Sequence, residues 1–206
     1  MRADILSMKF IAISQRILEN QDYYELRECL ALDWGSFFKK ELSGFLPLPL
    51  SYEIDFKNYI PSISAVILSG GNDLNSCKFS FINQKRDEYE KNIIKHCIQN
   101  NIPLLGVCKG AQMIASHFNS TICPCKDHVG NHEVYLNDQI INVNSYHNFA
   151  IKTLGNELEM LASVKDETIE AFKHKKFSIY GLMWHIEREN GMSEKSIFNA
   201  WLKDIK

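Results

Sequence analysis

The stretch LLGVCKGAQ, residues 104–112, decides the fold and the chemistry that we expect of this chain. The apolar run 103–107 predicts a buried strand, and residues 110–118 predict a helix that follows it directly. Cys108 stands between them in a G-x-C-x-G pattern, which is typical of a nucleophile elbow, a sharp strand-to-helix turn. Glycine at positions 106 and 110 lets this turn close without side-chain collisions, and the new helix N-terminus favours a thiolate. We therefore predict a cysteine nucleophile; the alternative is a small buried cysteine that only packs.

The composition of the 206 residues is that of a globular protein, with 45% hydrophobic and 23% charged residues. The 23 basic and 25 acidic residues leave a formal charge of −2. This near balance argues against nucleic acids as partners, which are bound by phosphate neutralisation, and against a polybasic membrane anchor. Because we find no linker and no internal repeat, we expect one domain that comprises residues 1–206.

The distribution of apolar residues and cysteines indicates where the protein works. No apolar run approaches the roughly 20 residues that span a bilayer, and residues 1–8 are too short and too mixed for a signal peptide. The six cysteines are scattered, which is typical of reduced thiols. We therefore expect a cytoplasmic protein with no membrane partner.

Strand-like and helix-like segments alternate along the chain. We predict strands at 9–14, 65–68, 103–107, 133–136, 139–143, 160–165, 168–172 and 178–184, an edge strand or loop at 45–50, and helices at 22–42, 83–100, 110–118 and 193–206. A turn at Asn137-Asp138 joins the fourth and fifth of these strands. Continuous apolar strands separated by helices predict an α/β fold with three layers, flavodoxin-like, in which both faces of a mostly parallel sheet are covered. The paired strands after residue 133 predict a small antiparallel extension.

His185 stands out among the seven histidines because it ends an apolar strand and is followed two positions later by Glu187. Side chains at i and i+2 of an extended segment point the same way, so the carboxylate can fix the imidazole tautomer and stabilise its cation. Taken alone, the pair reads equally well as an exposed histidine and glutamate at a strand end. Because a cysteine nucleophile needs a base, we predict a catalytic triad of Cys108, His185 and Glu187.

The stretch SGGND, residues 69–73, follows another apolar strand and predicts a tight turn. Attack on an amide creates an oxyanion, which needs backbone N–H donors aimed at it. We expect these donors at Gly71, where no side chain obstructs close approach, and at Lys109, directly after the nucleophile. An ordinary surface turn is the alternative, and the functional reading depends on the Cys108 strand ending next to this one.

The glycine turn, the cysteine elbow and the His-x-Glu pair, in that order, resemble the class I glutamine amidotransferase superfamily. Within it, the chain is similar to the γ-glutamyl hydrolase branch, peptidase family C26. Further resemblance lies in residues 11–16, 86–90, 102–112 and 143–147. The resemblance covers nearly the whole chain and implies the class I glutamine amidotransferase-like fold and cysteine-dependent hydrolysis of a γ-glutamyl amide, with a glutamyl thioester as intermediate.

The resemblance also implies roles for individual residues. Cys108 would be the nucleophile, His185 the base and Glu187 the group that orients it. The residues that would bind the glutamyl substrate are Gly70, Gln112, Asn144, Ser145, Tyr146 and His147. No cofactor and no metal ion is implied, and the partner would be a small molecule.

Two departures and one closer match refine this resemblance. The family usually has proline where this chain has Ile186, and the loop after Asp73 is shorter than in the γ-glutamyl-γ-aminobutyrate enzymes. The small size of the chain, the elbow CKG at residues 108–110 and the stretch HIERE at residues 185–189 are similar to one member that acts in bacterial capsule phosphoramidate biosynthesis. That similarity implies a γ-glutamyl amide whose nitrogen is bonded to phosphorus.

Several further features of the sequence remain open or are set aside. Cys123 and Cys125 with His128 and His132 suggest zinc, but structural zinc sites favour C-x2-C spacing, so we expect a loop beside the active site instead. The Lys109 side chain could attract an anionic substrate or simply lie at the surface, and the basic run 173–176 reads as a solvated turn. A glutaminase that delivers ammonia to a synthetase partner is a rival enzyme, and a sensor that keeps the fold without turnover is a rival of another class.

Overall fold

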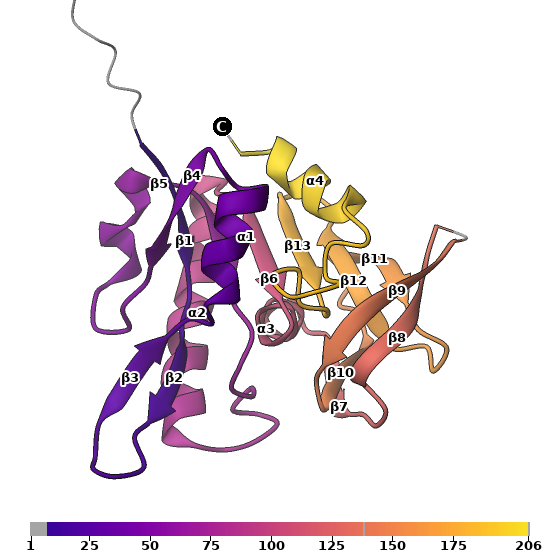
Figure 1. The fold of residues 1–206 in the computed structure, drawn as a ribbon, viewed down its shortest axis with the longest axis horizontal. Coiled ribbons are helices and arrows are strands. Elements are labelled where there is room, and N and C mark those ends of the chain that lie inside the picture. Colours follow the sequence, from indigo (N-terminus) through magenta and orange to yellow (C-terminus); the bar gives the residue numbers. More distant parts are fainter. Residues whose placement is uncertain (1–7, 138, 206) are drawn as a thin grey trace, which may run out of the picture.

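The computed structural model describes residues 8–137 and 139–205 (Figure 1). Asp138 of the predicted turn and Lys206, the last residue of the predicted C-terminal helix, lie outside these ranges. The strands are β1 Lys9–Ile13, β2 Arg16–Glu19, β3 Leu26–Cys29, β4 Phe45–Pro49, β5 Ile63–Leu68, β6 Leu104–Val107, β7 Thr121–Pro124, β8 Val129–Leu136, β9 Gln139–Tyr146, β10 Phe149–Thr153, β11 Leu158–Ser163, β12 Ile169–His174 and β13 Ile179–Leu182. The helices are α1 Asp33–Glu41, α2 Phe81–Asn100, α3 Lys109–His117 and α4 Ser196–Lys203, with 3-10 turns η1 Phe56–Asn58 and η2 Ile60–Ser62.

The main sheet has a parallel half and an antiparallel half. Strands β4, β1, β5, β6 and β13 lie side by side in that order and pair in parallel. Strands β12, β11, β8 and β9 continue the sheet with antiparallel pairing, and β10 and β7 attach beside β12. The predicted α/β fold, with its mostly parallel centre and antiparallel extension, is confirmed.

Helices cover both faces of the parallel half because the strands are apolar on both sides. Alternate strand residues such as Ile67 and Leu105 join one core cluster with the aromatic side chains of α1 and α4, among them Trp201. Their neighbours Val66 and Leu104 join a second cluster with the apolar side chains of α2 and α3. Each large apolar side chain buried in this way contributes about 1.5–3 kcal/mol, so the two clusters hold the three layers together.

The longest helix, α2, has clear end signals in its sequence. The Ser80 side chain accepts a hydrogen bond from the Asn83 N–H at 3.1 Å, which satisfies one of the free donors of the first turn. Asn101 ends the helix in the left-handed conformation, with φ 52°. The predicted helix 83–100 is therefore correct to within two residues.

The carboxyl ends of β5, β6 and β13 meet at one edge of the sheet. Leu68 pairs with Gly106, and Val107 pairs with Leu182, so the three strands end at nearly the same level. The turn 69–73, Cys108 and the segment 183–187 each follow one of these ends. The parallel topology thereby brings the three stretches that the sequence singled out to one place.

Two sequence predictions about secondary structure are wrong. The apolar spacing predicts a helix from residue 22, but β2 and β3 form a hairpin and the helix starts only at Asp33. That spacing suits either structure, and the Asn72 side chain stabilises the hairpin by binding both the N–H (2.9 Å) and the carbonyl (3.0 Å) of Ile17. Strands β7 and β10 are absent from the predicted set, because each is short and mixed and is defined by its pairing with the other.

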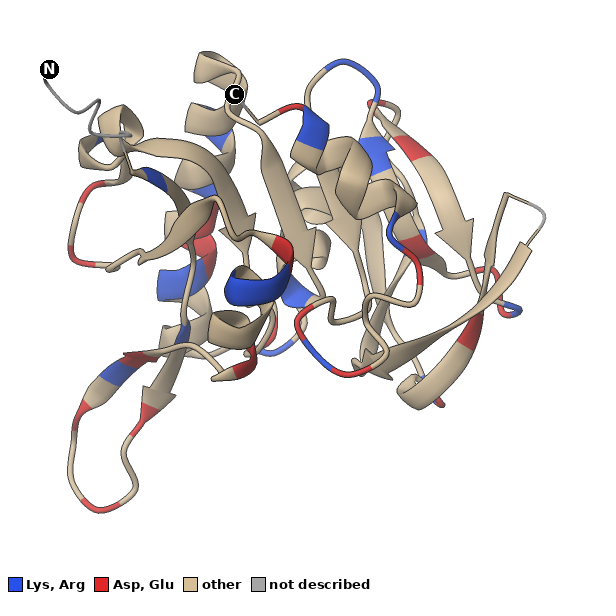
Figure 2. Ribbon diagram, turned by 45° about the horizontal axis from the view of Figure 1, so that its top comes forward, with Lys and Arg blue, Asp and Glu red and all other residues tan. Residues whose placement is uncertain are grey.

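The distribution of charged residues and the state of the cysteines can be compared with what the sequence led us to expect. Basic and acidic residues are interspersed over the fold in Figure 2. All six cysteines are free thiols in the structure. Among the described residues, we find no helix with the length and apolar character that a bilayer crossing requires.

Candidate active site

Cys108 lies on a strained turn between β6 and α3. Its backbone adopts φ 52° and ψ −107°, a conformation that costs a non-glycine residue about 1–3 kcal/mol and is concentrated at active sites. A Cβ on Gly110 would lie 2.0 Å from the Leu68 carbonyl oxygen, and one on Gly106 would lie 2.6 Å from the Gly110 backbone. Both glycines are therefore required for the close approach of the elbow to its neighbours, as the sequence predicts.

The backbone of His185 is held on both sides by one asparagine. The Asn144 Oδ1 accepts from the His185 N–H at 2.9 Å, and its Nδ2 donates to the carbonyls of His185 (2.9 Å) and Glu189 (2.8 Å). Strand β13 has ended by then, so residues 185–187 form a turn and not the extended segment that the sequence suggested. Hydrogen bonds from the Asn144 side chain, and not strand pairing, therefore hold the backbone that positions the His185 imidazole.

The His185 ring is buried and hydrogen-bonded on its Nδ1 atom. Nδ1 lies 2.7 Å from Glu187 Oε1, and the Tyr146 ring packs edge-on against the imidazole at 5.7 Å between centroids. Nδ1–H facing the carboxylate leaves Nε2 as the atom that can exchange a proton. This contact is the one that the spacing of the two residues predicts.

Cys108 and His185 line the same pocket, with Gly70 between them. A Cβ on Gly70 would lie 2.7 Å from His185 Cε1 and 3.5 Å from Cys108 Cβ, so only glycine leaves room for the two side chains. Burial lowers the pKa of His185, but the electrostatic influence of the neighbouring Cys108 and Glu187 outweighs it and raises the pKa to about 9. The arrangement can therefore hold an imidazolium beside the sulfur at neutral pH.

The glycine turn after β5 is held by a buried arginine. Arg86 of α2 is fully buried and donates to the carbonyl oxygens of Ser69 (2.6 Å), Gly70 (3.1 Å) and Gly71. In a trans peptide the C=O and the following N–H point in opposite directions. Because the Gly70 carbonyl faces Arg86, the Gly71 N–H faces away from it, as an oxyanion donor requires.

The charge of Arg86 belongs to a buried network that sequence reasoning missed. Glu90 binds Arg86 Nε at 2.9 Å and Lys109 Nζ at 2.5 Å, and Lys109 also lies 2.8 Å from Asp87. Neither expectation for the Lys109 side chain is correct, since it is 1% exposed and paired with these carboxylates. Its backbone N–H begins α3, where helix donors have no helical partner. The i, i+4 spacing of Arg86 and Glu90 was the only available signal.

The residues expected to bind substrate fall into two groups. Gln112, Tyr146 and His147 line the pocket with Cys108, whereas Gly70 lines a separate pocket that also contains His185. Asn144 and Ser145 do not line the Cys108 pocket: the asparagine clamps His185, and the Ser145 hydroxyl donates to the His128 carbonyl at 2.7 Å. Of the expected residues, Gln112, Tyr146 and His147 are thus placed at the wall of this pocket, whereas Asn144 and Ser145 hold backbone segments.

Two arginines that the sequence did not single out also line this pocket. Arg16 comes from β2, and Arg188 packs its guanidinium over the Tyr146 ring at 4.7 Å. The pocket measures about 200 Å³, which is below the 300–1,000 Å³ of sites that enclose a whole drug-sized ligand. It can take the end of a larger anionic molecule whose remainder lies along the surface.

A second cluster of the described residues brings together side chains of the kinds that can ligate a metal ion. Its members form two overlapping groups, Cys125 with His128 and His147, and His128 with His132 and Glu170. The cluster lies in the antiparallel half, and only His147 belongs to both this cluster and the Cys108 pocket.

Comparison with known proteins relates this chain to one family. Residues 49–205 match the family profile Glutamine amidotransferase class-I. Gamma-glutamyl-CDP-amidate hydrolase of Campylobacter jejuni is 56% identical over 198 residues, covering 96% of this chain and 99% of the relative. A glutamine-hydrolysing GMP synthase subunit from Methanobrevibacter smithii is 29% identical over 206 residues, covering 92% and 95%. A crystal structure of glutamine amido transferase from Methylobacillus flagellatus superposes with a TM-score of 0.69 at 10% identity, covering 98% and 96%, and so shares the fold.

Proposed function

This chain belongs to the class I glutamine amidotransferase family, and we propose that it hydrolyses the γ-glutamyl amide bond of γ-glutamyl-CDP-amidate. The carrying observation is the near full-length relative of that name. The products are glutamate and cytidine diphosphoramidate, which serves capsular polysaccharide modification. The meeting of Cys108 and His185 at one pocket supports the proposal, because the reaction needs both groups.

The first half of the reaction makes a thioester. The Cys108 thiolate attacks the γ-carbonyl carbon and forms a C–S bond, and the carbonyl oxygen takes the negative charge. The N–H groups of Gly71 and Lys109 stabilise this oxyanion. The His185 imidazolium, held by Glu187, gives its proton to the departing nitrogen, and the C–N bond breaks while the P–N bond stays intact.

The second half releases glutamate. Neutral His185 takes a proton from water as the water oxygen attacks the thioester carbon. The C–S bond then breaks, and the electron pair returns to sulfur as the Cys108 thiolate. His185 keeps the proton and is ready for the next turnover, so the chain's own residues balance the cycle.

The charges around the pocket suit a nucleoside diphosphate as leaving group. The pocket takes the glutamyl end, and the diphosphate would lie near Arg16 and Arg188, which line the same pocket. Guanidinium groups match phosphate oxygens in charge and planar geometry. The Tyr146 ring beneath Arg188 holds that side chain in place.

Mass spectrometry of glutamate release from a panel of substrates tests the proposal. The panel contains γ-glutamyl-CDP-amidate, glutamine and simple γ-glutamyl amines, each with the unchanged protein and with Cys108→Ala. We expect the CDP-amidate to be hydrolysed with the highest kcat/KM and the variant to be inactive. A clear preference for free glutamine would overturn the assignment.

A glutaminase that works within a larger enzyme is the second candidate, and the similarity to a GMP synthase subunit specifically favours it. Such a glutaminase hydrolyses glutamine for a synthetase partner. Tight co-purification with a synthetase, together with glutaminase activity only in the complex, would support this candidate. Hydrolysis of the CDP-amidate by the purified chain alone would exclude it as the main function.

A further inference from the structure

Three histidines surround one fully buried carboxylate in the antiparallel half of the sheet. Glu170 on β12 has no exposed surface, and its Oε1 lies 3.5 Å from His128 Nδ1 and 3.4 Å from His147 Nε2. Its Oε2 lies 3.4 Å from His132 Nε2. Within the described part of the chain, none of these five atoms makes a hydrogen bond. Buried polar atoms without partners are costly, so a group of this kind needs an explanation.

The outer ring nitrogens of two histidines show which atoms are free to act as ligands. His147 Nδ1 donates to the Phe149 carbonyl at 3.0 Å, and His128 Nε2 lies 3.0 Å from the Asp166 carboxylate. A proton on each of these outer nitrogens leaves a lone pair on the inner nitrogen, which faces Glu170. Metal-ligating histidines have this arrangement, in which a carboxylate or carbonyl binds the far side of the ring.

We propose that His128, His132, His147 and Glu170 bind one zinc ion. One ligand atom from each of His128, His132 and Glu170 lies within 4.8 Å of the other two, and His147 adds a fourth donor on the same carboxylate. A tetrahedral zinc with Zn–N and Zn–O distances of 2.0–2.1 Å separates its ligand atoms by about 3.3–3.4 Å. Each of the three histidine nitrogens lies 3.4–3.5 Å from a Glu170 carboxylate oxygen, which matches that spacing and exceeds ordinary hydrogen-bond lengths.

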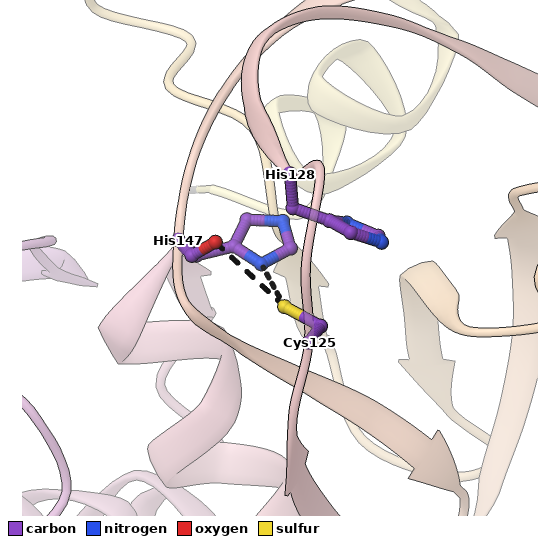
Figure 3. A group of neighbouring side chains, drawn as sticks. All are labelled: Cys125, His128 and His147. Atoms are coloured by element: carbon purple, nitrogen blue, oxygen red, sulfur yellow. Dashed lines mark hydrogen bonds between the residues drawn. The ribbon is translucent and has the colours of Figure 1, made fainter.

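Cys125 lies beside this cluster but outside the proposed ligand set. Figure 3 shows its sulfur next to the His147 ring, with Sγ 3.7 Å from Nδ1. That nitrogen is the one that donates to the Phe149 carbonyl, so its lone pair is not available to a metal. A site built on Cys125 would also leave the Glu170 carboxylate without a cation, whereas the proposed set neutralises it.

A surface cavity next to the histidine cluster gives an ion access to it, and the bound ion would affect the Cys108 pocket. His128, His132 and Asp166 line a surface cavity of about 460 Å³, through which an ion reaches the cluster. The ligands come from the segment before β8, from β8, from the β9–β10 turn and from β12. The ion would therefore fasten these elements together and fix the wall of the Cys108 pocket that contains His147.

Metal analysis of the purified full-length chain tests the proposal independently of any substrate. After expression with zinc and gel filtration without a polyhistidine tag, inductively coupled plasma mass spectrometry should find about one zinc per chain. A chelator should remove it and lower the melting temperature, and zinc, but not magnesium, should restore both. A chain with only trace metal, whose melting temperature does not respond to added zinc, would overturn the proposal.

Variants locate the ion. Glu170→Gln, which keeps the shape of the side chain, and His132→Ala, at the more exposed rim, should each abolish stoichiometric zinc. Asp166→Asn should weaken zinc affinity about 10–100-fold, the usual cost of losing an outer partner. His96→Ala, a histidine on α2 away from the cluster, and Cys125→Ser should keep full zinc content. Retention of zinc in both Glu170→Gln and His132→Ala, or its loss in Cys125→Ser alone, would refute the ligand set.

Discussion

The parallel and antiparallel halves of the sheet differ in how their buried charged side chains are paired. Beneath the candidate site at the carboxyl ends of β5, β6 and β13, which we call the candidate catalytic edge, the cations Arg86 and Lys109 are buried together with the carboxylates Glu90 and Asp87. The charges of this part of the structure therefore compensate one another. In the antiparallel half, buried Glu170 faces imidazole nitrogens that lack hydrogen-bond partners among the described residues. The closed ion network holds the backbone of the glycine turn in place, whereas the proposed role of the open donor cluster is to take up an ion.

The strongest test of this comparison removes the nucleophile. Cys108→Ala should lower glutamate release by at least about 10⁴-fold, because the bond-forming atom is lost, and should leave the zinc content unchanged. Glutamate assays and metal analysis on the same preparation measure both. The matched control is Cys97→Ala, which removes a buried cysteine that lies on α2, and this variant should stay active. Residual turnover near that of the unchanged protein would show that Cys108 is not the nucleophile.

The buried charge network around Arg86 should contribute more to stability than an exposed ion pair does. Arg86→Met leaves the buried Glu90 with the Ser14 hydroxyl and a single cation, Lys109, and frees three carbonyl groups. We therefore expect the free energy of unfolding to fall by about 3–5 kcal/mol. Urea unfolding followed by circular dichroism measures this. Arg27→Ala removes an exposed ion pair and should cost less than about 1 kcal/mol. Equal effects of the two substitutions would contradict the distinction.

The pH dependence of hydrolysis should report the candidate catalytic edge alone. The pKa of His185 is raised to about 9 by Cys108 and Glu187, so the proton for the leaving nitrogen is present below that pH, and kcat/KM should fall as pH rises through about 9. Glu187→Gln removes one cause of the raised pKa, so the fall should begin at lower pH, with kcat reduced about 10²-fold or more. A pH–rate series checks this. His132→Ala should not move the midpoint, and a matching shift there would mean that the two sites are electrostatically coupled.

The smallest expected effect concerns the leaving group. Arg188→Ala should raise the KM for γ-glutamyl-CDP-amidate about tenfold, the loss of roughly 1.4 kcal/mol that one charge-assisted phosphate contact supplies. Simple γ-glutamyl amines have no phosphate, so their KM should stay within a factor of two. Steady-state kinetics with both substrates distinguishes the cases. An equal rise for both would place Arg188 at the glutamyl end of the pocket.

The meeting of the glycine turn, Cys108 and His185 at one edge of the sheet could be predicted because each is a short local pattern at a strand end. The elbow around Cys108 needs glycines two residues away, and Glu187 lies two residues from His185. Parallel strands then place such patterns together without further information. The interpretation of 22–32 as helix failed because a hairpin pairing and the Asn72 side chain, which is remote in sequence, override an ambiguous apolar spacing.

The histidine cluster could not be predicted in the same way. In the sequence, the potential metal ligands near His128 and His132 are Cys123 and Cys125, and the spacing of these two cysteines argues against a metal site. The residues that change this view, His147 and Glu170, are distant along the chain and reach the cluster through strand pairing. Likewise, nothing in the sequence around Asn144 or Arg86 says that one clamps His185 and the other holds the glycine turn.

The sequence by itself determined the α/β class, the elbow, the glycine turn and the His-x-Glu pair, because each depends on residues within a few positions of one another. Only the tertiary structure decided the buried charge network, the arginines at the pocket and the donor cluster around Glu170. Contacts between distant segments depend on strand order and register, and those follow from how the whole chain packs its apolar faces and not from any local pattern.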